Sequence, residues 1–304
     1  MSKKFIATTA NCTLTDLLVQ YLGHHSSAMP FSEIDAKFFR FKDGECGFEL
    51  YENLYDKEVF VLANLRNDSH VMELFVLLDV LNRSSIKHLH VCFPYFLYAR
   101  SDRLYKSGVP VTSSMLAGLL SGFSINKVSV IDIHNLTIFN SFSKVALSNH
   151  VVSELFVNAL PVCDGKSIVV APDMGSIHRA KACAQLFGQE DIAIIYKERM
   201  QPGQSKSLSV LGDVRGKRCI IFDDIVDTAG TLCNAAGLLM QEGAVSVVAC
   251  ITHGLFSGDA YSKIVSSDLE YVYTTNTIES QEKLDKIKYV PVEEYIYRNI
   301  MIPS

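Results

Sequence analysis

The chain has 304 residues, 48% of them apolar, and carries 28 Lys and Arg against 33 Asp and Glu, a net charge of −5. This length predicts about two domains, and the apolar share is enough for large buried cores, which excludes an intrinsically disordered chain. The absence of a basic stripe argues against nucleic acid as the main partner, but it leaves phosphate ligands open because backbone amides bind them locally.

Short β-branched runs alternate with helical patterns along the chain. In chain order, the strand-like runs are 59–63, 88–93, 128–133, 167–171, 192–196, 219–222, 245–251 and 271–274. Continuous apolar runs of this length predict strands buried on both faces, as in parallel sheets covered by helices. Their alternation with helices predicts α/β architecture built from right-handed βαβ units.

Two stretches repeat the same order of elements, and this repeat indicates the domain organisation. A strand, a helix and a second strand are expected at 59–63, 72–82 and 88–93, and again at 219–222, 232–241 and 245–251. We interpret the repeat as two homologous domains, 1–148 and 149–304, although coincidence among generic βαβ units would also produce it. The polar segment 201–209 contains a Pro-Gly pair and is predicted to be a mobile loop of the kind that forms lids.

The cysteines and the apolar runs indicate the compartment. Eight cysteines are scattered along the chain without a C-x-x-C pair, and several lie in strand-like runs, where cysteine behaves as a small hydrophobe. This pattern predicts reduced thiols in a cytoplasmic protein. The first residues lack the apolar core of a secretory signal, and the longest apolar runs fall far short of the ~20 residues that span a membrane. We therefore expect a soluble protein with no membrane partner.

The strongest chemical signal is the segment 219–231, Cys-Ile-Ile-Phe-Asp-Asp-Ile-Val-Asp-Thr-Ala-Gly-Thr. It predicts a buried strand that ends in two acids and a small polar turn that opens a helix near Leu232. Ligands of open α/β sheets bind at the carboxyl ends of strands, and a helix N-terminus favours phosphate through its orphan N–H groups and its dipole. Asp223 and Asp224 are placed to accept hydrogen bonds from ribose hydroxyls. An acidic strand end followed by an ordinary helix cap would explain only one Asp and one Thr.

This segment resembles the ribose-phosphate loop shared by type I phosphoribosyltransferases and phosphoribosyl pyrophosphate (PRPP) synthetases. Further segments resemble the ribose-phosphate diphosphokinase (PRPP synthetase) family specifically, in family order from about residue 4 to the C-terminus: 41–45, 93–103, 131–134, 170–176, 196–199 and 252–258. The resemblance implies an α/β fold of two tandem phosphoribosyltransferase-like domains, each a mainly parallel sheet flanked by helices. The second domain would carry the ribose-phosphate loop.

The resemblance also implies a reaction. The family transfers the diphosphoryl group of ATP to O1 of ribose 5-phosphate, giving PRPP and AMP for nucleotide biosynthesis, with Mg²⁺ as cofactor. Positioning and electrostatics dominate such chemistry, because several negative charges must be neutralised during in-line attack. A non-catalytic PRPP synthetase-associated subunit and a phosphoribosyltransferase are the alternatives. The first predicts a disrupted Lys197 region or diphosphate loop, and the second predicts one catalytic domain with a base-recognition hood.

Site residues follow from the resemblance, position by position. ATP contacts are implied for Phe41, Asp43, Gly44, Glu45, Arg100, Ser101, Asp102 and His134. Because ATP lies between subunits in the family, 41–45 would reach a neighbour's site, which implies a homo-oligomer built from dimers, such as a hexamer. From the residues alone, Phe41 is equally compatible with core packing and Asp43-Gly44 with a plain turn.

The remaining site residues surround the sugar and the transferred phosphates. Lys197 and Arg199 are implied as catalytic cations, His134 and Asp173 as Mg²⁺ contacts, and 173–176 as a diphosphate loop (Asp173, Met174, Gly175, Ser176). Ribose 5-phosphate would be bound by Arg199, Asp223, Asp224, Asp227, Thr228, Ala229, Gly230 and Thr231. An ordinary solvated Lys-Glu-Arg run is the alternative interpretation of the segment around Lys197.

Several positions depart from the family pattern. Ser101 stands where Gln is usual, and His178 stands where the diphosphate loop usually has Lys. Leu136 and Phe139 replace small polar residues that help to form a second, regulatory anion site in relatives. A buried anion without donors is strongly disfavoured, so we expect activity without added phosphate and inhibition by ADP through competition with ATP. Replacement donors nearby are the alternative: Thr137, Asn140 and Ser141.

Overall fold

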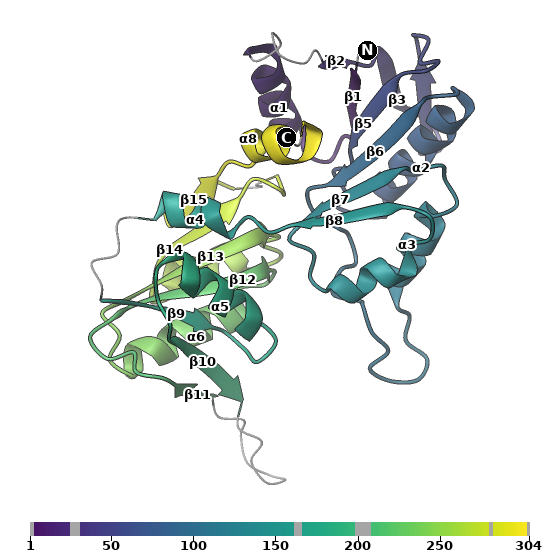
Figure 1. Cartoon of the computed structure of the whole chain (residues 1–304). Helices are drawn as coiled ribbons and strands as arrows, with labels where there is room; N and C mark the ends of the chain where they lie inside the picture. Colours follow the sequence, from purple (N-terminus) through teal and green to yellow (C-terminus); the bar gives the residue numbers. More distant parts are fainter. Residues whose placement is uncertain (1–2, 25–30, 161–165, 198–207, 280–281, 303–304) are drawn as a thin grey trace. The chain divides into compact units, whose positions relative to one another are not determined.

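The computed structural model describes residues 3–24, 31–160, 166–197, 208–279 and 282–302. The chain forms two compact units, whose elements are labelled in Figure 1. The first unit comprises Met1–Val151, Thr277–Glu279 and Val292–Ser304, and the second comprises Val152–Asn276 and Ser280–Pro291.

The first unit contains a parallel sheet of six strands among the described residues. Their spatial order is β2 (Phe31–Glu33), β1 (Lys3–Ala7), β5 (Glu58–Leu62), β6 (His88–Phe93), β7 (Lys127–Ile131) and β8 (Ala146–His150). The predicted domain boundary at 148/149 falls inside β8. Two more strands, β3 (Ala36–Arg40) and β4 (Cys46–Leu50), form an antiparallel hairpin.

The first unit has six helical segments among the described residues, of which the first three bury one apolar face each. They are α1 (Cys12–His24), α2 (Asp68–Arg83), α3 (Thr112–Leu120), the 3₁₀ helix η1 (Leu136–Ser141), and α8 (Glu293–Tyr295), which continues as the π-helix η2 (Ile296–Met301). In α2 the buried leucines are spaced so that they share one face of the helix: Leu74, Leu77, Leu78 and Leu81. Asn67 begins this helix, because its side chain accepts a hydrogen bond from the backbone N–H of His70.

The second unit contains a sheet of seven strands among the described residues. The order is β11 (Leu208–Leu211), β10 (Ile192–Lys197), β9 (Ser167–Ala171), β12 (Arg218–Val226), β13 (Ser246–Gly254), β14 (Leu269–Thr275) and β15 (Ile287–Val290). Only the pairing of β10 with β11 is antiparallel in this sheet. The helices are α4 (Ser153–Ala159), α5 (Ile177–Leu186), α6 (Gly230–Gln241) and α7 (Ala260–Ser266). Within the described part of the chain, no helix of either unit is long and apolar enough to cross a membrane.

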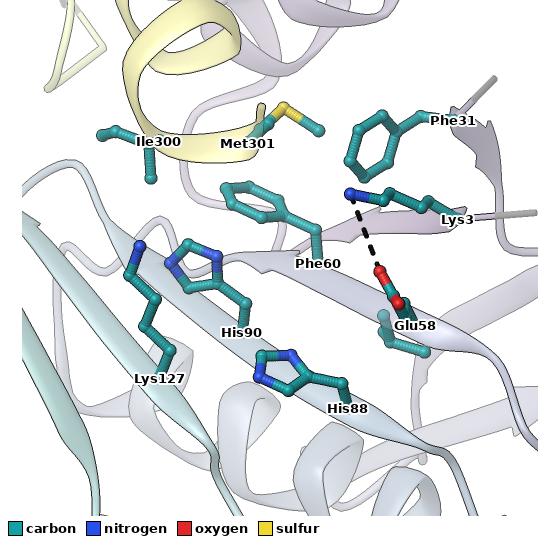
Figure 2. A pocket seen from close by; sticks show the side chains of 10 residues that line it. Lys3, Phe31, Glu58, Phe60, His88, His90, Lys127, Ile300 and Met301 are labelled. Atoms are coloured by element: carbon teal, nitrogen blue, oxygen red, sulfur yellow. Dashed lines mark ion pairs between the residues drawn. The ribbon is translucent and has the colours of Figure 1, made fainter. Parts of the chain in front are cut away.

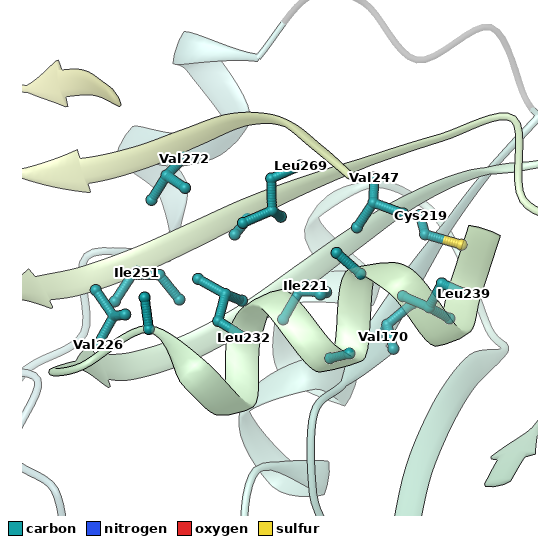
Figure 3. Close-up of a cluster of buried hydrophobic side chains, with 14 of the residues drawn as sticks. Val170, Cys219, Ile221, Val226, Leu232, Leu239, Val247, Ile251, Leu269 and Val272 are labelled. Carbon is teal, nitrogen blue, oxygen red and sulfur yellow. The ribbon is translucent and has the colours of Figure 1, made fainter. Parts of the chain in front are cut away.

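Alternate strand residues of the second sheet pack against helices on its two faces. On one face, Val170, Ile221 and Val247 contact a cluster that includes Leu232 and Leu239 of α6 (Figure 3). On the other face, strand residues such as Val169, Ile220 and Val248 share a cluster with α4 and α5. Burial on both faces explains the continuous apolar runs in the sequence.

The predicted fold class is confirmed: each unit is a mainly parallel sheet flanked by helices. The runs 88–93 and 167–171 match β6 and β9, but some predicted ends were wrong. Run 128–133 was too long, because Asp132 adopts a positive φ of 44° that ends β7 at Ile131. Segment 201–209 was also too long, since β11 already begins at Leu208.

Candidate active site

The predicted ribose-phosphate loop follows β12, one of the two longest strands of the second sheet. β12 extends to Val226 and not only to Phe222, because β13 pairs beside it as far as Gly254. Asp223 and Asp224 therefore lie within the last part of the strand, and the loop proper is 227–229. Helix α6 begins at Gly230, two positions before the residue expected from the sequence. The acids, the loop and the helix start are thus in the predicted order at the carboxyl end of β12.

The N-terminus of α6 has the features of an anion site. Ala229 is its N-cap, with a left-handed φ of 58°, and it makes no side-chain cap hydrogen bond. The first turn contains no acid. The backbone N–H groups of the first turn lack intrahelical partners, and the helix dipole adds partial positive charge at the same place. A phosphate is the ligand that such a helix start favours. The positive φ of a non-glycine residue is backbone strain of the kind found at ligand-binding loops.

The two acids of β12 form a cluster with a residue that sequence analysis missed, Arg179. Nη1 of Arg179 lies 3.2 Å from Oδ1 of Asp224 and 3.8 Å from Oδ1 of Asp223. Asp224 is buried, and its backbone N–H donates to Oδ1 of Asp223 at 3.0 Å. Burial, followed by the neighbouring Asp224 carboxylate, raises the pKa of Asp223 to about 8, although Arg179 acts in the opposite direction. The sequence signal that could have identified Arg179 is its position in the first turn of α5, the helix that follows the diphosphate loop. Because α5 packs against β12, a cation there can reach the acids of that strand.

The predicted diphosphate loop connects β9 to α5 and is closed by its own side chains. Oδ1 of Asp173 accepts the backbone N–H of Ser176 at 3.0 Å. The Ser176 hydroxyl donates to the Asp173 carbonyl at 3.0 Å and accepts the Asp173 N–H at 3.3 Å. Ser176 is buried, whereas Asp173, Met174 and Gly175 are exposed. The loop therefore presents its backbone to solvent in a fixed conformation. Its carboxylate is partly occupied by this internal bond.

The predicted catalytic cations lie at the end of β10. Lys197 is the last residue of that strand and pairs with Leu208 of β11. Its side chain, Arg199 and most of the predicted lid 201–209 lie outside the described residues. Their roles stay predictions.

In the first unit, two predicted segments meet after the neighbouring strands β6 and β7. Nδ2 of Asn135 donates to Oδ2 of Asp102 at 2.6 Å. Asp132 is buried, and its backbone N–H donates to the His150 carbonyl at 2.9 Å. Oδ1 of Asn149 accepts the N–H of Ile133 at 2.8 Å. β8 thus holds the turn that presents the exposed His134. Asn135 and Asn149 were not identified from the sequence.

Two other predicted ATP contacts lie in the loop after β6. Arg100 is exposed, while Ser101 anchors the loop that follows it. The Ser101 hydroxyl accepts the N–H of Thr112 and donates to the Pro110 carbonyl, each at 3.3 Å. The Ser101 carbonyl accepts from the N–H and hydroxyl of Ser113. In this structure Ser101 joins the two ends of the loop between β6 and α3. Its nucleotide contact stays a prediction.

The segment 41–45 is the tip of the β3–β4 hairpin. Oδ1 of Asp43 accepts the N–H of Glu45 at 3.1 Å, and Gly44 takes a φ of +93°, so Asp43-Gly44 does form a turn. Phe41 is 52% exposed and contacts Phe39 edge-on, which rules out core packing within this chain. Directly before the tip, Nη2 of Arg40 lies 2.7 Å from Oε1 of the buried Glu73 on α2. The tip is thus exposed at Phe41 and anchored to α2.

The candidate site residues are distributed over both units. The 41–45 tip, Arg100, Ser101, Asp102 and His134 belong to the first unit, and the diphosphate and ribose-phosphate loops belong to the second. Among the described residues, no group of three or more His, Cys, Asp or Glu side chains is arranged around a metal position. The pairing of His134 with Asp173 through an ion stays a prediction.

Comparisons with known proteins cover nearly the whole chain. The family model for the N-terminal domain of ribose phosphate pyrophosphokinase matches residues 4–123, and the phosphoribosyl synthetase-associated domain matches residues 188–301. A ribose-phosphate pyrophosphokinase from Campylobacter jejuni is 34% identical over 299 residues, which cover 95% of this chain and 92% of the relative. Another from Nitrosomonas europaea is 38% identical over 283 residues, 91% of this chain and 86% of the relative. The chain belongs to the ribose-phosphate pyrophosphokinase family.

A solved structure supports the same family. The crystal structure of phosphoribosylpyrophosphate synthetase from Mycobacterium smegmatis matches with a TM-score of 0.88 and 26% identity, over 97% of this chain and 96% of that one. The resemblance inferred from the motifs is therefore confirmed, as is the fold of two phosphoribosyltransferase-like domains. The matches run through both halves of the pyrophosphokinase chain. The alternative of a phosphoribosyltransferase with one catalytic domain is not supported.

Proposed function

We propose that this chain transfers the diphosphoryl group of ATP to O1 of ribose 5-phosphate, giving PRPP and AMP. The observation that carries the proposal is the start of α6, a helix N-terminus without a side-chain cap bond, which follows the strand that carries two acids held by Arg179. A sugar phosphate matches this arrangement, because its phosphate suits the helix start and its hydroxyls suit the carboxylates. Family membership supplies the reaction.

The sugar would be bound entirely by the second unit. The 5-phosphate accepts backbone N–H bonds and hydroxyl bonds from 227–231, with Asp227, Thr228, Ala229, Gly230 and Thr231 forming the cradle. Asp223 and Asp224 bind the ring hydroxyls. Because burial raises the pKa of Asp223, that group can donate a hydrogen bond when protonated and accept one when ionised. The cluster thus fixes the sugar with O1 directed away from the phosphate cradle.

The nucleotide would be bound by loops of the first unit. Arg100, Ser101, Asp102 and His134 contact ATP in their own subunit. The hairpin tip, with Phe41, Asp43, Gly44 and Glu45, contacts the ATP of a neighbouring subunit. Its exposed Phe41 and its anchoring through Arg40 and Glu73 support a role outside its own chain. This assignment requires a homo-oligomer built at least from dimers.

The transfer itself needs charge neutralisation more than covalent help. O1 of the sugar releases its proton to solvent and forms a bond to the β-phosphorus. The bond from that phosphorus to the oxygen that bridges it to the α-phosphorus breaks, and AMP leaves with that oxygen. Lys197 and Arg199 neutralise charge on the transferred group, and the backbone of 173–176 receives the diphosphate. The internal bonds use the N–H groups of Asp173 and Ser176 and hold the loop in one conformation. The N–H groups of Met174 and Gly175 are therefore the ones that would receive the diphosphate, without rearrangement of the loop.

Mg²⁺ is the proposed cofactor, with His134 and Asp173 as its protein contacts. The residues fit this ion: Asp173 is exposed and uses only Oδ1 for the Ser176 N–H, and Mg²⁺ keeps several waters and needs few protein ligands. When bound, the ion would supply charge neutralisation on the ATP phosphates.

The first test is the reaction. Purified protein should form AMP from ATP only when ribose 5-phosphate is present. Lys197→Ala should lower kcat by ~100- to 1000-fold, the usual effect of removing one group that stabilises transition-state charge. The exposed Lys283 of the same unit is the matched control, and Lys283→Ala should leave kcat unchanged. Release of ADP instead of AMP would show that a different bond is cleaved and would overturn the assignment.

The second test concerns the metal. His134→Ala and Asp173→Ala should each raise the Mg²⁺ concentration for half-maximal rate, because each removes a direct or water-mediated contact. Asp173→Asn removes the charge but keeps the hydrogen bond within the loop, because an amide oxygen can still accept the Ser176 N–H. This variant therefore tests the charge alone. An unchanged Mg²⁺ dependence in all three variants would mean that these side chains are structural.

A further inference from the structure

A pocket of about 200 Å³ lies at the amino ends of the strands of the first sheet. Four parallel strands begin at its wall: β1 with Lys3, β5 with Glu58, β6 with His88 and β7 with Lys127. The proposed ATP segments of this unit follow the carboxyl ends of β6 and β7 instead. The pocket is therefore separate from the site described above.

The pocket combines an apolar wall with basic groups. The apolar lining residues come from the sheet region, Phe31 and Phe60, and from η2, Ile300 and Met301. Figure 2 shows Phe60, His90 and Lys127 extending from neighbouring strands toward the helix that carries Ile300 and Met301. Such a combination suits a ligand that has one apolar part and one charged part.

The basic groups outnumber the acids. Oε2 of Glu58 lies 3.6 Å from Nζ of Lys3, so this acid balances the charge of Lys3. The side chain of Lys127 makes no ion pair or hydrogen bond with any described residue, and His88 at the start of the neighbouring strand is exposed. Within the pocket lining, an anion would therefore meet the Lys127 ammonium, which no acid of the lining balances.

His90 supplies a directional hydrogen-bond donor at the pocket wall. It is only 9% exposed, and Nε2 lies 2.8 Å from the Ser129 hydroxyl. The chain continues from Ser129 to Ser148 at 2.8 Å and from Ser148 to Nε2 of His150 at 3.0 Å. No described residue is hydrogen-bonded to Nδ1 of His90, although the imidazole lines the pocket.

The surroundings keep this imidazole neutral. Burial, followed by the charges of Lys127, His88, His150 and Lys3, lowers the pKa of His90 to about 3. A neutral imidazole carries one N–H and one lone pair, and the partner of one nitrogen sets the role of the other. If the Ser129 hydroxyl donates to Nε2, then Nδ1 carries the proton and points a donor into the pocket.

We propose that this pocket binds a small organic anion of the carboxylate or phosphonate class, held by the Lys127 ammonium and by Nδ1–H of His90. The apolar part of the ligand packs against Phe60 and Met301. Binding selects one direction of the buried chain, in which His150 donates to Ser148, Ser148 to Ser129, and Ser129 to His90. Hydrogen bonds aligned in this way polarise and strengthen one another.

Benzoate and phenylphosphonate are suitable probes, with inorganic phosphate and chloride at equal ionic strength as comparisons. Histidine ¹⁵N spectra of the full-length protein report the proton position on each ring separately. Both organic probes should shift the His90 signals saturably and yield the Nδ1–H form. Phosphate should act more weakly because it lacks the apolar part. Binding of one organic probe alone would identify its acid group as the ligand class.

The matched variants are Lys127→Met, which keeps side-chain length without charge, and Lys37→Met at an exposed position outside the pocket. Lys127→Met should weaken probe binding by about tenfold, the scale of one charge-assisted hydrogen bond. Lys37→Met should have no effect. His88→Ala should also weaken probe binding, by a smaller factor. This second variant tests the pocket even if the Lys127→Met protein does not fold. Shifts that chloride reproduces, that Lys127→Met leaves unchanged, or that yield the Nε2–H form of His90 would overturn the proposal.

Discussion

The units β5–α2–β6 and β12–α6–β13 have the same topology but opposite chemistry at the start of their helices. Both are strand-helix-strand units whose strands are parallel neighbours. Helix α2 is capped by the Asn67 side chain and has Asp68 in its first turn. Helix α6 has neither a side-chain cap nor an acid in its first turn. One helix start therefore has an N–H group occupied by its cap and an acid that repels anions, whereas the other can accept a phosphate.

The strand ends differ in charge. At the end of β5, Asn64 is buried and uses its side chain for internal hydrogen bonds to Asn11 and Thr15. At the corresponding place β12 carries Asp223 and Asp224, which are held by Arg179. The comparison teaches that the fold only creates the place for a phosphate site. Whether the site exists depends on the residues that occupy this place: a side-chain cap, an acid in the first turn and a neutral amide in the first unit, but two carboxylates and no side-chain cap in the second.

The largest expected effect comes from giving α6 the acid that α2 has. Thr231→Asp should raise the KM for ribose 5-phosphate by roughly 1000-fold, because like charges brought together cost several kcal/mol. The same acid is favourable for the helix itself, so thermal stability should not fall. Thr231→Asn is the neutral control of equal size, and steady-state kinetics measure both. An equal loss in both variants would mean that the hydroxyl, not the charge balance, matters.

The reciprocal change in the first unit sharpens the result. Asp68 accepts a hydrogen bond from the Tyr98 hydroxyl, which raises the pKa of Tyr98 to about 12. Asp68→Asn removes the charge and keeps an acceptor. This variant should not create a second ribose 5-phosphate site, because Asn67 still occupies the helix start. Two bound sugar phosphates per chain in equilibrium dialysis would show that charge alone separates the two units.

A smaller effect is expected from Arg179, the cation that the acids of β12 require. Arg179→Met leaves the buried Asp224 without this guanidinium and should lower the free energy of unfolding by ~3 kcal/mol at pH 8, as for other broken buried pairs. The deficit should shrink toward pH 5, because a carboxyl that loses its cation protonates more easily. Urea unfolding at both pH values measures it. Arg83→Met breaks an exposed pair with Asp79 in α2 and should leave stability unchanged.

Sequence reasoning identified what depends on local pattern. Continuous apolar runs located the central strands, and the segment 219–231 located the proposed phosphate site, because strand, acids and helix start are contiguous there. Short edge elements such as β2, β11 and β15 were missed, since three or four residues carry too little periodicity. Contacts between side chains that are far apart in the sequence could not be predicted from local patterns. Arg179 reaches Asp224 from 45 positions away, and Asn149 reaches the turn before His134 only because β8 pairs with β7.

The smallest effect, and the one most specific to the second unit, is the pH dependence caused by Asp223. Its pKa is raised to about 8, first by burial and then by Asp224, whereas in the unfolded chain an Asp titrates near ~3.9. Between these values the folded state binds the extra proton, so stability falls as pH rises from about 4 to 8. Asp223→Asn removes this proton and should be about as stable as the wild type at pH 4 but ~1–2 kcal/mol more stable at pH 8.5, allowing for the 28% exposure of the side chain.

Asp213→Asn should show the opposite sign, because the Arg215 N–H and Lys217 lower the pKa of Asp213. Urea unfolding of the ligand-free variants across this range tests both. A constant difference between Asp223→Asn and the wild type would mean that Asp223 is ionised throughout, and the cluster would then bind sugar hydroxyls only as an acceptor.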